Sequence, residues 1–363
     1  MLGDEEAEAA GRVVKSGWVT EGRESQAFVE ELSALVGAPY GVLAPNGTLA
    51  LALGLMALGV GPGDEVLVPD TTFVGSATAV LLTGARPVFV DVDPINFQID
   101  IAHAERFLSH ATRAIMPVHL YGTACDMDAV TDFASSHGLK VIEDAAQGVG
   151  VHYKGRHVGS IGDVGCFSFF ADKTVTTGEG GFVACRDAAI YERLRLFRNQ
   201  GRLKSGTFIH PSVGYNFRIT DIQSAIGRIQ LRKLGAIAAT KRVLYETYVE
   251  ELRDVGSVRI LQAAKDAELI PFRCVILSDD AQGLMTHLAE NRVEPRSFFY
   301  PLHLQPAFRE LTFGRCDDAD YPNAMMGYRR GVCLPIHCAL SREDVSRIAA
   351  LIRSHHLARA SRV

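Results

Sequence analysis

One lysine of this 363-residue chain follows an apolar run and precedes a segment of small and hydroxylated residues. Lys173 comes after the sequence CFSFFAD and is followed by TVTTGEGG. Poor solvation beside aromatic residues lowers the pKa of an amine, which leaves more of it in the nucleophilic form. Such an amine can hold a carbonyl compound as a Schiff base. Most lysines are solvated surface residues, so the position of Lys173 alone leaves the ordinary interpretation open.

A second group of residues could bind an anion. The triplet Asn46-Gly47-Thr48 follows the apolar sequence VLAP and begins a helical pattern. Free backbone N–H groups, a glycine that permits close approach and a threonine hydroxyl together suit a phosphate. The same triplet is most often an ordinary helix cap, so on its own it predicts little.

A carboxylate at the end of a predicted strand is the third candidate. Glu143 and Asp144 follow the sequence KVI, and Ala145 and Ala146 come next. A carboxylate in this place can pair with a protonated ring nitrogen, and the two alanines leave room for a flat ring. A helix cap or a structural ion pair explains Asp144 equally well when the residue is considered by itself.

The three groups together fit one cofactor. Pyridoxal phosphate needs donors for its phosphate, an anion for its ring nitrogen and an amine for its aldehyde. Gly47, Asp144 and Lys173 provide these in that order along the chain. Phe73 follows the sequence VPDTT at another strand end and could stack on the ring, although core packing explains it as well.

The elements that must position these residues are short strands and helices in alternation. From residue 41 to about residue 185 the apolar runs are EVLVP, RPVFVDV, AIMPVHLYG, KVIEDAA, GCFSFF and GGFVAC, separated by helical patterns. This alternation is typical of an α/β fold with a mainly parallel sheet covered by helices on both faces. Such sheets bind ligands beyond the carboxyl ends of their strands, where the candidate residues are expected.

The second half of the chain has a different pattern. Thr220 and Gln223 form a capping box, and one long helical pattern runs from Ile222 to about Leu252. Mixed strand-like and helical segments follow it. Because single cores stop growing near ~250 to 300 residues, we predict two domains. The large domain, with an N-terminal helical segment, covers residues 1–235, and a small C-terminal α/β domain covers residues 236–363.

The composition argues against several classes of protein. A formal net charge of -5 and a pI of about 6.2 do not fit a general nucleic-acid surface. No apolar run reaches the ~18 residues of a membrane span, and the acidic N-terminus is unlike a signal peptide. Seven cysteines without a CxxC pair indicate reduced thiols in a cytoplasmic protein. The spacing of Cys333, His337 and Cys338 matches no usual zinc pattern, so no metal is predicted.

Several segments resemble one protein family. They are APNGTLALALG, PVHLYGTACDMD, VIEDAAQGVG, FSFFADKTVTTGEGG and GYNFRITDIQSAIGRIQL. They are similar to segments of the DegT/DnrJ/EryC1/StrS family of sugar aminotransferases, and the likeness runs from about Val19 to Pro335. The resemblance implies the fold type I, aspartate aminotransferase-like scaffold with pyridoxal 5′-phosphate as cofactor. One branch of the family has histidine at the lysine position and performs 3-deoxygenation, so Lys173 places this chain on the aminotransferase side.

The resemblance also implies roles for individual residues. Lys173 would be the Schiff-base lysine, and Asp144 would face the pyridine nitrogen. Asn216 in the sequence GYNFR would reach a phosphate across a homodimer interface, so that each active site would need two subunits. The other implied cofactor contacts are Gly47, Thr48 and Ser168 at the phosphate, Phe73 over the ring and Gln147 by the ring hydroxyl.

The substrates implied by the resemblance are L-glutamate and a nucleotide-linked keto sugar. Phosphates of a nucleotide call for cations or hydrogen-bond donors, and Arg218, Arg296, His303 and Lys204 lie in segments that could line the cleft. A solvated charge or a local hydrogen bond explains each of them too. Another nucleotide-linked ketone or an aminocyclitol precursor remains an alternative acceptor. A regulator without turnover is a remote alternative, because Lys173 is intact and no basic DNA-binding segment is evident.

Overall fold

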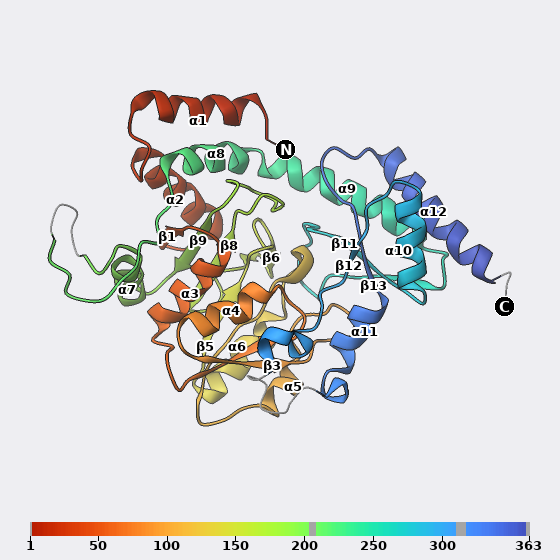
Figure 1. Cartoon of the computed structure of the whole chain (residues 1–363), viewed down its shortest axis with the longest axis horizontal. Coiled ribbons are helices and arrows are strands. Elements are labelled where there is room, and N and C mark those ends of the chain that lie inside the picture. The colour runs from red at the N-terminus through yellow and green to blue at the C-terminus, as the bar shows by residue number, and fades with distance from the viewer. Residues whose placement is uncertain (1, 203–207, 310–316, 361–363) are drawn as a thin grey trace.

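The computed structural model describes residues 2–202, 208–309 and 317–360, which form two lobes around two main sheets (Figure 1). Within these ranges the larger sheet has seven strands in the order β1-β9-β8-β5-β4-β2-β3. Their bounds are β1 Tyr40–Ala44, β2 Glu65–Pro69, β3 Arg86–Val90, β4 Thr112–Ile115, β5 Lys140–Asp144, β8 Val164–Ser168 and β9 Gly181–Cys185.

Strands β3, β2, β4, β5 and β8 run parallel, which confirms the predicted α/β fold with a mainly parallel sheet. Strand β9 is antiparallel to both of its neighbours, β8 and β1. The chain between β8 and β9 contains Lys173 and no helix, so it turns back instead of crossing over the sheet. The carboxyl ends of the parallel strands therefore share one edge of the sheet, and the Lys173 loop begins there.

Helices cover both faces of the larger sheet (Figure 1). An apolar cluster lies on each face of the sheet. One cluster includes residues of α3, α4 and α7, and the other includes residues of α2, α5 and α6. The bounds are α1 Asp4–Ser16, α2 Arg23–Val36, α3 Gly47–Leu58, α4 Val74–Leu82, α5 Ile101–Glu105, α6 Met127–His137, α7 Ala188–Arg198 and α8 Asp221–Arg232, with the short 3₁₀ helix η1 Leu120–Gly122.

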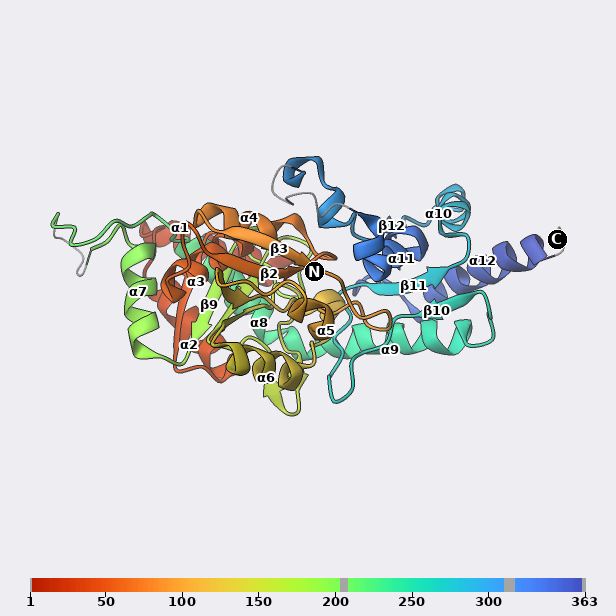
Figure 2. The same ribbon diagram turned by 90° about the horizontal axis from the view of Figure 1, so that it is seen from below.

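The predicted long helix after Thr220 is two helices in the structure. The capping box is confirmed: the Thr220 side chain accepts from the Gln223 N–H, and the Gln223 side chain accepts from the Thr220 N–H. Helix α8 ends at Arg232, and α9 begins at Leu234 and continues to Leu252. The sequence pattern missed this break because apolar positions continue across Lys233 at helical spacing. Helix α9 runs from the larger lobe along the smaller one (Figure 2).

The smaller lobe has an antiparallel sheet in the order β10-β11-β13-β12. Its elements are β10 Val258–Ile260, β11 Cys274–Ser278, β12 Arg296–Ser297, β13 Gly331–Leu334, α10 Ala281–Glu290, α11 Pro322–Arg330 and α12 Arg342–Ala360. The remaining short elements are β6 His152–Tyr153, β7 Arg156–His157, η2 Leu302–Leu304, η3 Pro306–Phe308 and η4 Asp318–Asp320. The domain boundary at residues 235 and 236 stays a prediction, which would place it within the first turn of α9.

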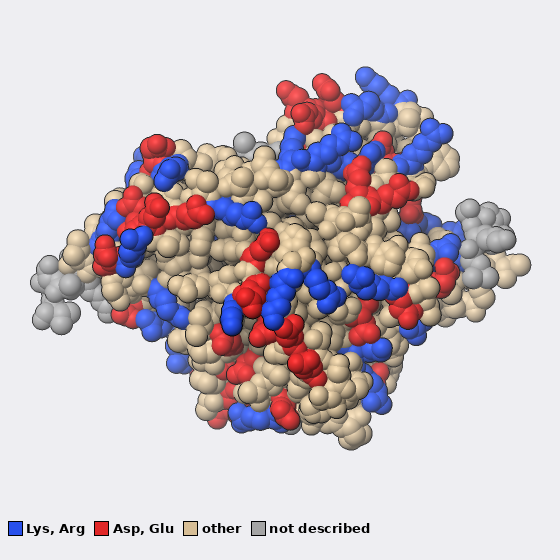
Figure 3. Space-filling view, turned by 180° about the vertical axis from the view of Figure 1, so that it is seen from behind, with Lys and Arg blue, Asp and Glu red and all other residues tan. Residues whose placement is uncertain are grey.

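Charges of both signs are interspersed over the face of the molecule shown in Figure 3, where Lys and Arg lie among Asp and Glu. None of the helices in the described ranges is both long and apolar enough to cross a membrane.

Candidate active site

The residues predicted to hold a phosphate lie together where helix α3 begins. Asn46 caps this helix, and its side chain accepts a hydrogen bond from the Leu49 N–H at 2.9 Å. A Cβ atom added at Gly47 would lie 2.8 Å from Cβ and 3.1 Å from Oγ of Ser168, so only glycine fits against that serine. The Oγ1 atom of Thr48 lies 2.8 Å from the place that a Cβ at Gly75 would take. The structure thus brings two hydroxyls to the adjacent N-termini of α3 and α4, which suits an anion.

Asp144 lies at the end of β5 and is buried. Its Oδ2 accepts from Ser76 Oγ at 2.7 Å, and its Oδ1 accepts from the Ala146 N–H at 3.1 Å. Burial raises the pKa of the Asp144 carboxyl, and these hydrogen bonds and the charge of Lys173 only partly oppose the shift. A buried carboxylate with two donors still has lone pairs to offer, so a protonated ring nitrogen is a partner that would stabilise its charge.

The Lys173 amine lies 4.7 Å from the centroid of the Phe272 ring. Within the described part of the chain it has no hydrogen-bond acceptor. Burial lowers the pKa of Lys173, and the nearby Arg273 guanidinium lowers it further, while the charges of Asp172 and Asp144 act the other way. Arg273 is itself held by Asp172, with 2.7 Å between Nη2 and Oδ2. The predicted desolvated amine is therefore present, and its charge interacts with that of Asp144.

Gln147 and Phe73 complete the predicted surroundings of the ring. The Gln147 Oε1 atom accepts the backbone N–H of Tyr121 at 2.6 Å, which orients the amide so that its NH₂ group is the end left to donate. Phe73 is 60% exposed and precedes the first turn of α4, where its ring lies 3.0 Å from a Cβ built on Gly75. An aromatic ring left this open beside a polar site is not core packing, so the alternative explanation of Phe73 is wrong.

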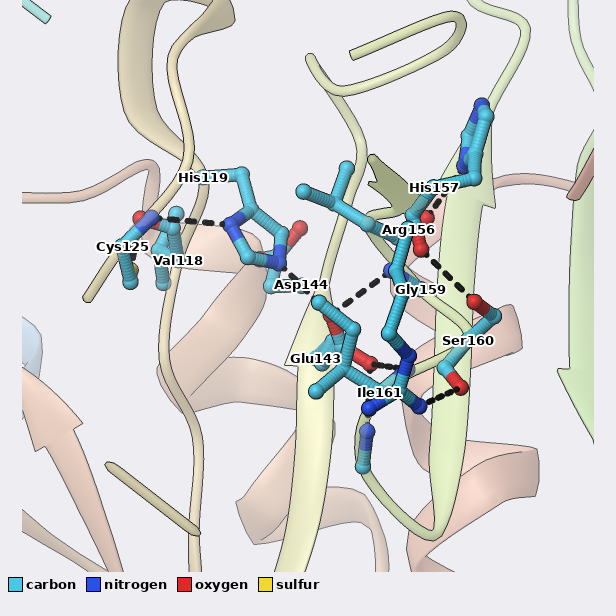
Figure 4. Close-up of polar contacts among 12 residues, drawn as sticks. Val118, His119, Cys125, Glu143, Asp144, Arg156, His157, Gly159, Ser160 and Ile161 are labelled. Atoms are coloured by element: carbon cyan, nitrogen blue, oxygen red, sulfur yellow. Dashed lines mark hydrogen bonds and ion pairs between the residues drawn. The ribbon is translucent and has the colours of Figure 1, made fainter. Parts of the chain in front are cut away.

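A second buried carboxylate lies beside Asp144. Glu143 accepts from His119 Nε2 at 2.9 Å, and both side chains are inaccessible to solvent (Figure 4). It also accepts the backbone N–H groups of Gly159, Ile161 and Gly162, each at 2.7 Å. Burial alone would raise the pKa of Glu143, but these hydrogen bonds outweigh it and lower the pKa below its ordinary value.

Four predicted residues lie outside this cluster. Asn216 is exposed and pairs through its backbone with Asn199, the residue that follows α7 and caps it, and Arg218 donates to the side chain of the same Asn199 at 2.9 Å. Arg296 lies on β12 with an exposed side chain. His303 is fully buried. Lys204 lies outside the described residues.

His303 forms a pair with Asp70, the residue that follows β2. The distance from His303 Nδ1 to Asp70 Oδ2 is 2.7 Å, and the His303 backbone N–H donates to Asp70 Oδ1 at 2.7 Å. The imidazole also stacks on Tyr321, with 4.2 Å between ring centroids. The hydrogen bonds to Asp70 therefore account for His303 in this structure, and its role toward a substrate stays a prediction.

Several residues of the site have weak local sequence signals or none. Ser76 could have been found, because it lies three residues after Phe73 and so faces the same way at the start of a helix. Phe272 and Arg273 come from the distant segment before β11, and nothing in their local sequence indicates that they reach Lys173.

The fold and the site together define an aminotransferase of the pyridoxal-phosphate class. The chain belongs to the DegT/DnrJ/EryC1/StrS aminotransferase family, whose pattern matches residues 1–353. It is 36% identical to GDP-perosamine synthase of Escherichia coli, over 98% of this chain and 96% of that protein. It is also 36% identical to UDP-N-acetyl-3-dehydro-alpha-D-glucosamine 3-aminotransferase of Acidithiobacillus ferrooxidans, over 97% and 94%. A Streptococcus pneumoniae protein solved in its PLP form superposes with a TM-score of 0.93 at 26% identity, over 98% and 97%.

The cofactor is pyridoxal 5′-phosphate, and the residues present fit it. Gly47, Thr48 and Ser168 would hold the phosphate, and Asp144 would hold the ring nitrogen. Lys173 would hold the aldehyde carbon. When bound, the cofactor supplies an electron sink for the carbon that loses a proton during amino transfer.

Proposed function

We propose that this enzyme transfers the amino group of L-glutamate to a nucleotide-linked 4-keto-6-deoxy sugar, with GDP-4-keto-6-deoxymannose as the acceptor. The observation that carries the proposal is the match to GDP-perosamine synthases, at 34 to 37% identity over more than nine-tenths of this chain. The intact Lys173, held in a partly desolvated position, supports amino transfer rather than deoxygenation.

Lys173 is the residue that moves the proton in this scheme. Burial lowers the pKa of the Lys173 amine, so more of it is in the basic form, which can take a proton from the donor Cα and deliver it to the cofactor carbon. Burial raises the pKa of Asp144, so its charge would depend on the protonated ring nitrogen that it faces. The NH₂ group of the Gln147 side chain can donate toward the ring hydroxyl.

A second acceptor class has specific support. The identity to the UDP-linked 3-aminotransferase equals the identity to the Escherichia coli GDP-perosamine synthase, at 36%. Gln147 also departs from the glutamate that perosamine enzymes often have at this place. A UDP- or dTDP-linked ketone is therefore the alternative.

A panel of acceptors separates these possibilities. The holoenzyme is given L-glutamate and, in turn, GDP-4-keto-6-deoxymannose, a UDP-linked 4-keto sugar, a UDP-linked 3-keto sugar and an aminocyclitol ketone, and 2-oxoglutarate release is measured. We expect the highest kcat/KM with the GDP-linked sugar. A clear preference for a UDP-linked ketone would favour the alternative, and no turnover with any nucleotide sugar would contradict the proposal.

We also propose a homodimer with shared active sites, working in the cytoplasm. The segment around Asn216 exposes apolar side chains: Phe208 is 88% exposed, and Ile209 and Val213 are each 77% exposed. Apolar side chains this open are expected to be covered by a partner. A second copy that covers them would receive Asn216 next to its own phosphate cradle. The six cysteines in the described ranges are all unpaired, which supports a reducing compartment.

Complementation tests the shared site. Lys173→Ala and Asn216→Ala are each expected to be inactive alone, because each damages every site of a homodimer. Random mixing would make half the dimers mixed, each with one intact site, so about a quarter of wild-type activity is expected from the symmetry. A dimer with unshared sites would show no recovery on mixing.

A further inference from the structure

Glu143 is adjacent to Asp144 on β5 but points away from it, because successive side chains of a strand alternate. Four N–H groups converge on its two oxygens. Oε1 accepts from the Ile161 and Gly162 backbones, and Oε2 accepts from the Gly159 backbone and the His119 ring. A buried carboxylate with all its acceptor sites filled is a fixed anion, and its position is defined from several directions at once.

The hydrogen bonds of His119 define its tautomer. The Cys125 backbone N–H donates to His119 Nδ1 at 3.2 Å, so Nδ1 carries no proton (Figure 4). The proton is therefore on Nε2, which donates it to Glu143. His119 therefore donates to Glu143 and accepts from the Cys125 backbone, so both of its ring nitrogens are used.

The main chain of the same histidine is tied to Asp144. The His119 N–H donates to the Asp144 carbonyl at 3.0 Å, and the Asp144 N–H donates to the Pro117 carbonyl at 2.9 Å. The side chain and the backbone of His119 therefore hold two consecutive residues of β5. Neither Glu143 nor His119 was among the site residues predicted from the sequence.

We propose that Glu143, held by His119 and by the loop over residues 159–162, is a positioning residue that fixes the direction of the Asp144 carboxylate toward the cofactor ring nitrogen. Among the described residues, the Asp144 side chain accepts only two hydrogen bonds, from Ser76 Oγ and the Ala146 N–H. The direction of the Asp144 carboxylate therefore depends on how rigidly the end of β5 is held. The inference rests on the proposed function only in that Asp144 faces the ring nitrogen.

The test compares two ligands of one site. The probes are pyridoxal 5′-phosphate and its 1-deaza analogue, in which carbon replaces the ring nitrogen. In Glu143→Gln an amide NH₂ faces two N–H donors, so the strand end shifts. We expect the Kd of pyridoxal phosphate to rise about 10-fold, the usual lower cost of losing an outer-shell partner, while the Kd of the analogue changes less than about 2-fold, because it makes no ring-nitrogen contact to lose.

Glu6→Gln is the matched control. Glu6 is a buried glutamate on α1, remote from the sheet edge, that accepts from Gly3 N–H, Gln230 Nε2 and Lys233 Nζ. These bonds outweigh burial and lower the pKa of Glu6 to about 2. Its replacement is expected to reduce thermal stability and to leave both Kd values unchanged.

Equal losses for the two ligands in Glu143→Gln, or no loss for either, would overturn the inference and leave Glu143 a purely structural residue. His119→Phe serves as a second variant in case Glu143→Gln does not fold, since it removes one of four donors and is expected to give a smaller shift in the same direction. Wild-type protein that does not bind pyridoxal phosphate would contradict the proposed function itself, so the two failures are distinguishable.

Discussion

The carboxyl edge of the large sheet is used in two different ways. At the ends of β5 and β8, Asp144, Ser168 and the Lys173 loop present polar groups whose hydrogen bonds are only partly filled. At the ends of β2 and β3, the carboxylate oxygens of Asp70 and Asp91 accept hydrogen bonds from the C-terminal part of the chain. Asp70 binds His303, and Asp91 accepts the backbone N–H groups of Asn323 and Ala324 at the start of α11.

This difference shows that a strand-end aspartate is not by itself a catalytic signal. Asp144 would hold a ligand at the part of the edge that the returning chain leaves open, whereas Asp70 and Asp91 hold the returning chain where it covers the edge. His303 is a similar case. Its imidazole could contact a substrate, but in this structure it joins a distant segment of the chain to the end of β2. Substitutions at the ends of β5 and β8 and at the ends of β2 and β3 test this difference.

The largest effect is expected for Lys173→Ala. Proton transfer by a positioned side chain alone contributes ~10² to 10⁴-fold, so turnover should fall by at least about 10²-fold, with the fold retained. The measurement is 2-oxoglutarate release together with circular dichroism. Turnover within 10-fold of wild type would remove Lys173 from the mechanism.

Asp144→Ala is expected to come next and is paired with Asp91→Asn. Loss of a preorganised charge at the reacting centre costs roughly 10²- to 10³-fold in turnover, and cofactor retention should fall much less. Asp91→Asn should cost about 1 kcal/mol of stability, as loss of a helix cap does, with unchanged turnover. Similar losses of turnover in Asp144→Ala and Asp91→Asn would contradict the difference between the open and covered parts of the sheet edge.

His303→Leu should act mainly on stability. Breaking a buried pair costs about 3 to 5 kcal/mol, while turnover should change less than about 3-fold. His303→Asn, whose amide can still donate to Asp70, should recover part of the stability. Large loss of kcat/KM for the nucleotide sugar with normal stability would instead make His303 a substrate residue.

The same pair predicts a pH dependence. Burial alone would lower the pKa of His303, but the hydrogen bonds and charges of Asp70 and Asp318 outweigh it and raise the pKa above its ordinary 6.5. A raised pKa in the folded state means that the stabilisation is complete below pH 6.5 and is lost as the pH rises through the raised value. Thermal unfolding between pH 6 and pH 9 should therefore show a decline in stability in wild type that is flattened in His303→Leu.

The smallest effect is expected for Gln147→Glu. A carboxylate at this place still accepts the Tyr121 N–H but offers no N–H donor to the ring hydroxyl. We expect turnover to change by less than about 10-fold, roughly the value of one hydrogen bond. A reversal of preference between GDP- and UDP-linked acceptors would show that Gln147 selects the substrate.

Much of the fold, and the strand-end residues that are proposed to hold the cofactor, could be predicted from the sequence, because both depend on local patterns. Alternating apolar runs indicated the parallel strands, and residues placed directly after such runs, including Asp144 and Ser168, lie at the sheet edge. The break between α8 and α9 was missed because the apolar spacing continues through it.

The contacts made by distant segments could not be predicted in the same way. Phe272 reaches Lys173, and His303 reaches Asp70, only because the smaller lobe returns to the sheet edge. Glu143 and Asp144 are neighbours in sequence with opposite pKa shifts, and the cause is the number of donors that the fold brings to each. Such donors come from tertiary structure and have no local signature.

The central claim is that Lys173 at the open edge holds pyridoxal phosphate and passes an amino group from glutamate. The most direct measurement is the visible absorbance of the purified protein with pyridoxal phosphate, before and after L-glutamate. We predict a visible band that is absent in Lys173→Ala and that glutamate removes from wild type, with release of 2-oxoglutarate. A wild-type protein without a bound chromophore, or with a band that glutamate does not change, would contradict the account.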